Sequence, residues 1–405
     1  MASSTGFDAA TLERFADLLV GFGANVQVGQ IVTIGADVGK EEVVRALAIS
    51  AYKHGAKFVE AAYFDPHVKH ARLKYAEQDT LDFVPSWLGA RILALGEQRA
   101  ARISLSGPME PGLMDDIDPV RAGMDQLPFV KEGAKVVNDA TTNWTIGPCP
   151  SVSWAKLVFP DLDDDAALAK LASQLLHVCR LDLDDPVGAW RERFTTLTAA
   201  AARMSERRFE ALHFEGPGTD LTVGLLPTST FLAASFETVD GIKHMPNLPS
   251  EEIFTTPDPV RTSGVVRATK PLALGGSIIR GLEVEFREGR AVRIDADENA
   301  DVLRGYAAKD DGAAMLGEVA LVDGDGRIGA LGTVFFDTLL DENAASHIAL
   351  GSAYAMCMDG DADLPRINTS QIHVDFMIGG NEVSVTGVTT AGDRVPALVR
   401  GAWQV

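Results

Sequence analysis

A chain of 405 residues is long enough for two domains of ordinary size, or for one large barrel, each around a sizeable apolar core. Its 36 Lys and Arg against 57 Asp and Glu give a formal charge of -21, which argues against nucleic acid or an anionic membrane surface as partner. No apolar run approaches the roughly 18 residues that span a bilayer, so the sequence excludes a helical membrane protein.

The cysteine and histidine content limits the chemistry further. The three cysteines are too widely spaced for a disulfide framework or a Cys-x-x-Cys zinc site. Together with an N-terminus that has no basic and apolar export pattern, they predict a cytoplasmic protein. Only eight histidines occur, so a histidine-dependent enzyme offers few candidates.

The N-terminal half alternates strand-like and helical periods. The strand-like runs are 26–34, 57–63, 101–105 and 144–146. The helical runs are 41–52, 163–176 and 190–203. This alternation predicts an α/β domain with an open, mostly parallel sheet and flanking helices.

The sequence pattern changes near residue 208, where short strand-like runs of alternating apolar and polar residues begin, separated by turn residues. The clearest signal is a hairpin of 282–286 and 291–294 closed around Glu288-Gly289. We therefore predict an N-terminal α/β domain of residues 1–207 and a strand-rich α+β domain of residues 208–405.

The sequence lacks the common nucleotide-binding and serine hydrolase motifs. Gly21-Phe22-Gly23 lacks the third glycine of a dinucleotide fingerprint and precedes a strand, so it predicts a helix-to-strand turn. Neither a Gly-x-Ser-x-Gly elbow nor a P-loop occurs. A serine hydrolase and a Walker-type site both become less favoured.

Potential metal ligands gather in the strand-rich half. His373 and Asp375 stand two apart in a strand-like run, which puts imidazole and carboxylate on one face and Ile372, Val374 and Phe376 on the other. This arrangement suits a shared metal ion. A hydrogen-bonded structural pair explains it as well.

Three further segments are ambiguous when each is taken alone. Glu318 lies in an apolar strand-like run, where a glutamate is either on an exposed edge or held by a metal or a base. If the stretch from Asp341 is helical, His347 and Tyr354 share a face; a helix N-terminus with acidic residues is the alternative. The run 247–257 contains a Ser-Glu-Glu sequence that a capped turn would also explain.

Taken together, these four segments resemble the aminopeptidase T family of cocatalytic metallopeptidases. They stand in the family's order and at similar spacing, and the resemblance extends to 154–160 and to the length of the chain. The segments are Asn247-Leu248-Pro249-Ser250-Glu251-Glu252-Ile253-Phe254-Thr255-Thr256-Pro257, Gly317-Glu318-Val319, Asp341-Glu342-Asn343-Ala344-Ala345-Ser346-His347 with Tyr354, and His373-Val374-Asp375-Phe376-Met377.

The resemblance implies a metal-dependent aminopeptidase that acts on short peptides. Tyr354 would donate a hydrogen bond to the transition state or occasionally act as a metal ligand. One of the glutamates, with Glu318 as the first choice, would pass a proton to the leaving amine. It also implies a homodimer whose active sites face an internal cavity, with the N-terminal domain giving dimer contacts and access. The residues implied to hold two divalent metal ions are Glu252, Glu318, Glu342, His347, His373 and Asp375, with Glu252 preferred to Glu251 on spacing.

Carboxylate and imidazole ligands suit zinc, cobalt or manganese, and a pair of such sites can hold one water between two cations. The rival interpretation is a mononuclear Fe(II) ring-cleaving dioxygenase, because His347, His373 and Asp375 would form a two-His-one-carboxylate triad. The additional glutamates favour two metals. A non-catalytic peptide-binding protein on the same fold is the third interpretation.

Overall fold

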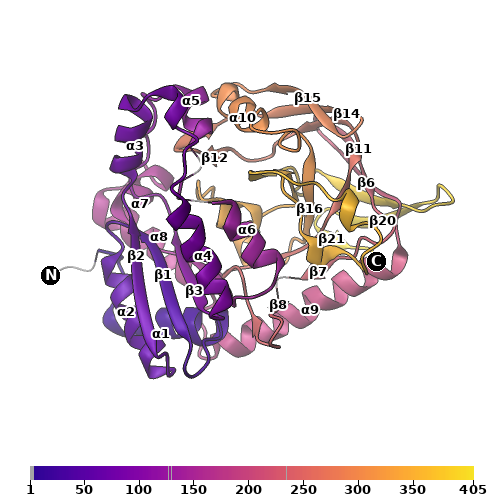
Figure 1. The fold of residues 1–405 in the computed structure, drawn as a ribbon. Helices are drawn as coiled ribbons and strands as arrows, with labels where there is room; N and C mark the ends of the chain where they lie inside the picture. Colours follow the sequence, from indigo (N-terminus) through magenta and orange to yellow (C-terminus); the bar gives the residue numbers. More distant parts are fainter. Residues whose placement is uncertain (1–3, 126, 129, 234) are drawn as a thin grey trace. The chain divides into compact units, whose positions relative to one another are not determined.

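The computed structural model describes residues 4–125, 127–128, 130–233 and 235–405 (Figure 1). It divides into two compact units. Unit 1 comprises the described residues of Met1–Ile117, Asp125–Arg193 and Ala234–Ser250, and unit 2 those of Asp118–Met124, Phe194–Ala233 and Glu251–Val405. These units are defined by compactness and include separate stretches of the chain. The boundary between two domains near residue 207 therefore stays a prediction.

Unit 1 is built on a four-stranded parallel sheet. Its order is β2 (Phe58–Phe64), β1 (Ile31–Asp37), β3 (Ala101–Ser106) and β4 (Trp144–Pro148). Figure 1 shows β2, β1 and β3 side by side in indigo and violet. Strand β1 begins later than the predicted 26–34, because residues 28 and 29 form a turn in which Gly29 has a φ of +83°.

Helices connect and flank these strands, and α2 contacts both β1 and β2. The predicted open parallel sheet with flanking helices is therefore confirmed. The helices and remaining strands of unit 1 are α1 (Ala9–Asp17), η1 (Leu18–Gly23), α2 (Glu41–Lys53), α3 (Pro66–Tyr75), η2 (Gln78–Thr80), α4 (Ser86–Glu97), α6 (Lys131–Asn138), α7 (Val152–Val158), α8 (Asp164–Val178), β8 (Phe236–Glu237) and β9 (Lys243–His244).

Sequence signals explain several of these boundaries. The Asp163 side chain accepts a hydrogen bond from the Ala166 N–H at 2.8 Å and caps α8, as the acidic start of the helical pattern predicts. The Gly21-Phe22-Gly23 segment belongs to the π-helical turn η1 that continues α1, and the chain then runs toward β1. Helix α9 (Pro186–Arg207) contributes residues to both units.

Unit 2 is strand-rich, and its two larger sheets are antiparallel throughout. One sheet has five strands in the order β18 (His373–Met377), β17 (His347–Gly351), β16 (Leu316–Val322), β10 (Glu252–Thr255) and β7 (Leu232–Ala233). The other has eight, in the order β15 (Arg290–Asp295), β14 (Glu283–Arg287), β11 (Pro257–Arg267), β6 (Thr219–Leu225), β5 (Ala211–Gly216), β19 (Ser384–Val388), β20 (Arg394–Val399) and β21 (Ala402–Trp403).

The smaller elements of unit 2 complete the strand-rich architecture expected of the C-terminal half, which is confirmed. They are α5 (Pro119–Met124), β12 (Leu272–Leu274), β13 (Ser277–Ile279), α10 (Ala300–Ala307), α11 (Arg327–Leu331), α12 (Thr338–Glu342), η3 (Ala355–Cys357) and η4 (Leu364–Arg366). Among the described residues, no helix is long and apolar enough to cross a bilayer.

The predicted hairpin is present as β14 and β15. Its two turn residues, Glu288 and Gly289, have φ values of +49° and +83°, the left-handed pair that matches the twist of the flanking strands. A Cβ on Gly289 would lie 1.9 Å from the Pro259 carbonyl oxygen, so only glycine fits at this position.

The expectation of a helix through His347 is wrong. The helix α12 ends at Glu342, and His347 opens strand β17 instead. All five residues of β17 are buried between β16 and β18. A short apolar run buried on both faces does not distinguish strand from helix by periodicity, which is why the pattern misled. His347 and Tyr354 therefore share no helix face.

A buried histidine in unit 1 should make stability depend on pH. His244 is 3% exposed, with ring centroids 6.3 Å from Trp144 and 6.0 Å from Phe236. Burial lowers the pKa of His244 from 6.5 to about 4, so the unfolded chain binds more protons between these values. Stability from this group is present above pH 6.5 and is lost as the pH falls toward 4.

We expect this loss to be on the order of 2–3 kcal/mol between pH 7 and pH 4. The measurement is the difference in urea-derived free energy of unfolding between the wild type and His244→Phe, followed over that pH range. The variant keeps an aromatic ring but has no titrating group. Parallel pH curves for the two proteins would contradict the prediction.

Candidate metal centre

The predicted ligands lie on neighbouring strands of the five-stranded sheet in unit 2. Glu252 opens β10, Glu318 lies in β16, His347 opens β17, and His373 and Asp375 lie in β18. Backbone pairing fixes these positions, since His347 stands opposite Ala320 and Asp375 opposite Ala349. The central strands β16 and β17 are buried along their whole length, so Glu318 lies in the interior and not on an exposed edge.

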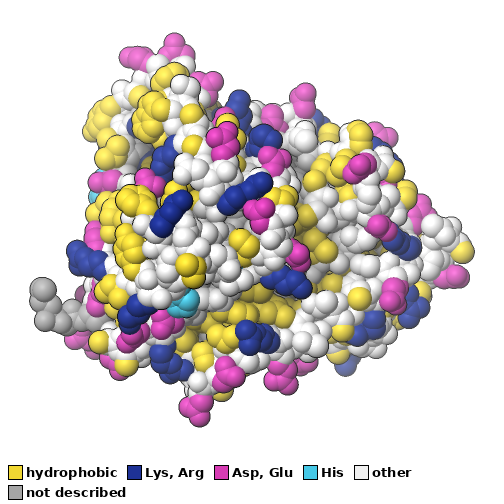
Figure 2. Space-filling model, turned by 60° about the horizontal axis from the view of Figure 1, so that its bottom comes forward, with side chains coloured by type: hydrophobic (Ala, Val, Ile, Leu, Met, Phe, Trp, Pro, Cys, Tyr) yellow, Lys and Arg dark blue, Asp and Glu magenta, His cyan; other side chains and the backbone are white. Residues whose placement is uncertain are grey.

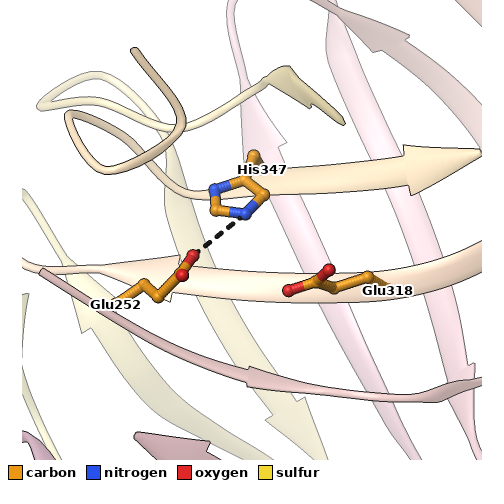
Figure 3. Close-up of side chains that lie close together, drawn as sticks. All are labelled: Glu252, Glu318 and His347. Atoms are coloured by element: carbon orange, nitrogen blue, oxygen red, sulfur yellow. Dashed lines mark ion pairs between the residues drawn. The ribbon is translucent and has the colours of Figure 1, made fainter. Parts of the chain in front are cut away.

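One cluster of potential ligand atoms contains Glu252, Glu318 and His347. One ligand atom from each residue lies within 4.8 Å of the others. His347 Nε2 is 3.1 Å from Glu252 Oε2, and Figure 3 shows the three side chains converging from their strands. All three residues are buried.

A second cluster contains Glu318, His373 and Asp375. His373 Nε2 lies 3.1 Å from Glu318 Oε2 and 3.4 Å from Asp375 Oδ1. His347 Nε2 is 4.0 Å from the same oxygen of Asp375, so the two clusters adjoin. Glu318 belongs to both. The structure thus brings together five of the six predicted ligands as two overlapping groups.

Backbone carbonyls orient both imidazoles. Nδ1 of His347 is 2.9 Å from the carbonyl oxygen of Glu342, and Nδ1 of His373 is 2.8 Å from that of Ser352. Because a carbonyl only accepts, each Nδ1 carries the proton and donates it. This leaves Nε2 of each ring directed at the carboxylates. An imidazole with its proton on Nδ1 is the tautomer that can bind a metal ion through Nε2.

Glu342 and Tyr354 lie beside these clusters. The charges of Asp375 and Glu252 act on Glu342, whose pKa is raised well above its usual value, first by burial and then by these neighbours. The Tyr354 ring centroid lies 5.1 Å from that of His373. Glu342 is thus near the ligand groups without joining either of them, and Tyr354 packs directly on a predicted ligand.

The electrostatics of the centre fit bound cations. Among the described residues, Glu252 Oε2 and Asp375 Oδ1 are buried and accept no hydrogen bond of acceptable geometry. Burial raises the pKa of Glu318, and the charge of Asp375 adds to this effect. Although burial alone would lower it, the carboxylates of Glu252, Asp375 and Glu318 hold the pKa of His347 well above the usual value.

Four carboxylates therefore face two imidazoles in a buried space. Such an excess of negative charge is costly unless cations or protons compensate it. Divalent cations would supply positive charge beside these carboxylates. Oxygen and imidazole nitrogen donors are also the types that zinc, cobalt and manganese accept.

Sequence reasoning missed Asn343, which is fully buried. Its Oδ1 accepts from the Glu251 N–H at 2.7 Å, and its Nδ2 donates to the Leu339 carbonyl at 3.0 Å. These bonds join the end of α12 to the start of β10. The only available signal was its place between Glu342 and His347 in a segment already singled out.

Comparison with known proteins identifies the family. The model of the thermophilic metalloprotease (M29) family matches residues 8–403. The chain belongs to this family. Aminopeptidase T of Thermus aquaticus is 40% identical over 97% of this chain and 98% of its own length. Aminopeptidase PepS of Streptococcus thermophilus is 36% identical, with 97% and 98% covered.

A solved structure agrees with this assignment. Wild-type AmpT from Thermus thermophilus has a TM-score of 0.87 and is 39% identical, with 98% of this chain and 99% of that chain covered. This M29 chain is accordingly a peptide hydrolase that uses divalent metal. The comparisons give the iron dioxygenase interpretation no support, and the chain is an enzyme rather than a passive peptide-binding protein.

The two neighbouring glutamates at the start of β10 provide a test of the ligand assignment. In the M29 chain, Glu251 directly precedes β10 and Glu252 opens it, and of the two only Glu252 joins a ligand cluster. We expect Glu252→Gln to lower the metal content per chain, measured by inductively coupled plasma mass spectrometry after gel filtration. Glu251→Gln, an equally buried and equally conservative change, should retain it. Equal metal loss in both variants would contradict the assignment.

Proposed function

We propose that the chain is an aminopeptidase that releases N-terminal residues from short peptides. Two divalent ions, zinc, cobalt or manganese, would be held by Glu252, Glu318, Glu342, His347, His373 and Asp375. The observation that carries the proposal is the pair of ligand clusters that share Glu318. The relatives named as aminopeptidases support the same activity.

The bound ions would polarise the scissile carbonyl and lower the pKa of an attacking water. The chain's own residues would do the rest. Glu318, close to both clusters, would take up a proton and pass it to the leaving amine. The acid-rich surroundings would suit the positively charged α-amino group of the substrate.

The proposed role of Tyr354 is to donate a hydrogen bond to the carbonyl oxygen as negative charge develops on it. Its ring lies against His373 and Phe254, which fixes the direction of the phenol. Burial raises the pKa of Tyr354 well above its usual value, so the phenol keeps its proton at neutral pH. A preorganised donor of this kind stabilises the transition state more than the ground state.

The activity is tested by release of p-nitroaniline from leucine p-nitroanilide. We expect hydrolysis by the metal-loaded protein, loss of activity after dialysis against a chelator, and recovery when zinc, cobalt or manganese is returned. His347→Ala should be inactive under all three conditions, because it removes an imidazole from the centre. The proposal would be refuted if the wild type still hydrolysed the substrate after chelation and the His347→Ala variant hydrolysed it as well.

Tyr354→Phe removes the proposed donor and keeps the ring that packs on His373. We expect kcat to fall by about 10²-fold with little change in KM, since the missing hydrogen bond forms chiefly in the transition state. Metal content should stay at the wild-type level. A variant with wild-type kcat would show that the phenol takes no part in the reaction.

We further propose a homodimer with active sites facing an internal cavity, in the cytoplasm. The resemblance to the aminopeptidase T family supports the dimer, and exposed apolar side chains of unit 1 such as Phe83 and Trp87, each 65% exposed, offer contact area. Sedimentation equilibrium tests the dimer, and a monomer mass at micromolar concentration would exclude it.

The surface charge bears on the kind of partner. On the face drawn in Figure 2, acidic and basic side chains are interspersed, in keeping with a partner other than nucleic acid.

A further inference from the structure

A single threonine side chain holds the backbone of Tyr354. Thr256 Oγ1 donates a hydrogen bond to the Tyr354 carbonyl oxygen at 2.8 Å and accepts one from the Tyr354 N–H at 3.1 Å. Thr256 is fully buried, and the two residues are 98 positions apart in the chain. One hydroxyl group thus makes both contacts across a long sequence separation.

The segment that supplies Glu252 also supplies Thr256, whose hydroxyl holds the Tyr354 backbone. Glu252 and Phe254 are alternate residues of β10 and face the same side, and Thr256 directly follows the last residue of that strand. Phe254 contacts the Tyr354 ring edge-on, with a centroid separation of 5.7 Å. Five consecutive residues therefore carry a predicted metal ligand, a contact to the Tyr354 ring and a contact to the Tyr354 backbone.

The backbone of Tyr354 has no strand ladder to fix it. The residue lies after β17 and before η3, outside regular structure. Besides Thr256, its carbonyl accepts only the Cys357 N–H at 3.2 Å among the hydrogen bonds of the described residues. The Thr256 backbone is held in turn, since Ser229 Oγ donates to its carbonyl at 2.7 Å.

We propose that Thr256 is a positioning residue that sets the place of the Tyr354 phenol relative to the metal centre. The inference rests on the proposed role of Tyr354 in catalysis. Removing the hydroxyl leaves the Tyr354 N–H and carbonyl without their common partner, and this frees the segment that carries the phenol to shift. A displacement of about 1 Å at a reacting group costs up to about 10²-fold in rate.

The first test compares Thr256→Val with Thr256→Ser. Valine keeps the shape of threonine but makes neither hydrogen bond, whereas serine keeps the hydroxyl. With leucine p-nitroanilide as substrate, we expect Thr256→Val to lower kcat by about tenfold with KM nearly unchanged, and Thr256→Ser to restore most of the rate. Failure of serine to restore the rate would overturn the proposal.

Thr255→Val is the matched control. Thr255 is equally buried, and its Oγ1 donates to the Thr230 carbonyl at 2.8 Å, so the variant also loses a hydrogen bond from a buried threonine of the same segment. We expect it to have a similar effect on thermal stability but to keep kcat within about twofold of the wild type. A kcat as low as that of Thr256→Val would overturn the proposal.

A double-mutant cycle with Tyr354→Phe separates positioning from general loss of structure. If Thr256 acts through the phenol, Thr256→Val costs little in the Tyr354→Phe background, and the two effects are not additive. The proposal would be overturned if Thr256→Val lowered kcat by the same factor in the wild-type and Tyr354→Phe backgrounds. Loss of bound metal in Thr256→Val would also overturn it. A second measurement that needs no turnover is the affinity for the phosphonic acid analogue of leucine, a tetrahedral anion, which Thr256→Val should weaken about tenfold.

The cycle also distinguishes the two proposals. A Tyr354→Phe variant with wild-type kcat would overturn the role of the phenol and this inference with it. A slow Tyr354→Phe together with a Thr256→Val of wild-type kcat would overturn the inference alone.

Discussion

The buried negative charge in the five-stranded sheet is the constraint on which the rest of unit 2 depends. Glu252, Glu318 and Asp375 place carboxylates in the interior of a sheet whose central strands are buried along their length. Two of their oxygens accept no hydrogen bond from the described residues. A fold that holds like charges this closely is stable only when positive charge compensates them. The same carboxylates that make the interior costly are therefore the groups that we propose as metal ligands.

Two kinds of structure hold the proposed ligands in place. The strands fix the places of the side chains, because pairing of β16, β17 and β18 leaves no freedom along the sheet. The segments just outside the strands fix the imidazoles, through the carbonyls of Glu342 and Ser352. Glu342 therefore acts on the centre in two ways, with its side-chain carboxyl group and with the backbone carbonyl that orients His347. Effects at these positions should not add independently.

Local pattern was enough to predict part of this site from the sequence. His373 and Asp375 share a face because a strand repeats every two residues, and the structure places them so. His347 shows the limit, since a five-residue run buried on both faces has no period that separates strand from helix. Asn343 and Thr256 show another limit. Their contacts are with backbone atoms 92 and 98 residues away, so no local spacing records them.

The segment from Glu252 to Thr256 connects these observations. It places a carboxylate in a proposed ligand cluster, a ring against Tyr354 and a hydroxyl on the Tyr354 backbone. Within β10, the side chains of Glu252 and Phe254 share a face because a strand alternates. A shift of one residue in the pairing of β10 would turn Glu252 and Phe254 away together. The pairing of Glu252 with Val322 and of Thr255 with Val319 in β16 opposes such a shift. The register of β10 therefore places the proposed ligand Glu252 and the Phe254 ring that contacts Tyr354, while the Thr256 hydroxyl that follows the strand holds the Tyr354 backbone.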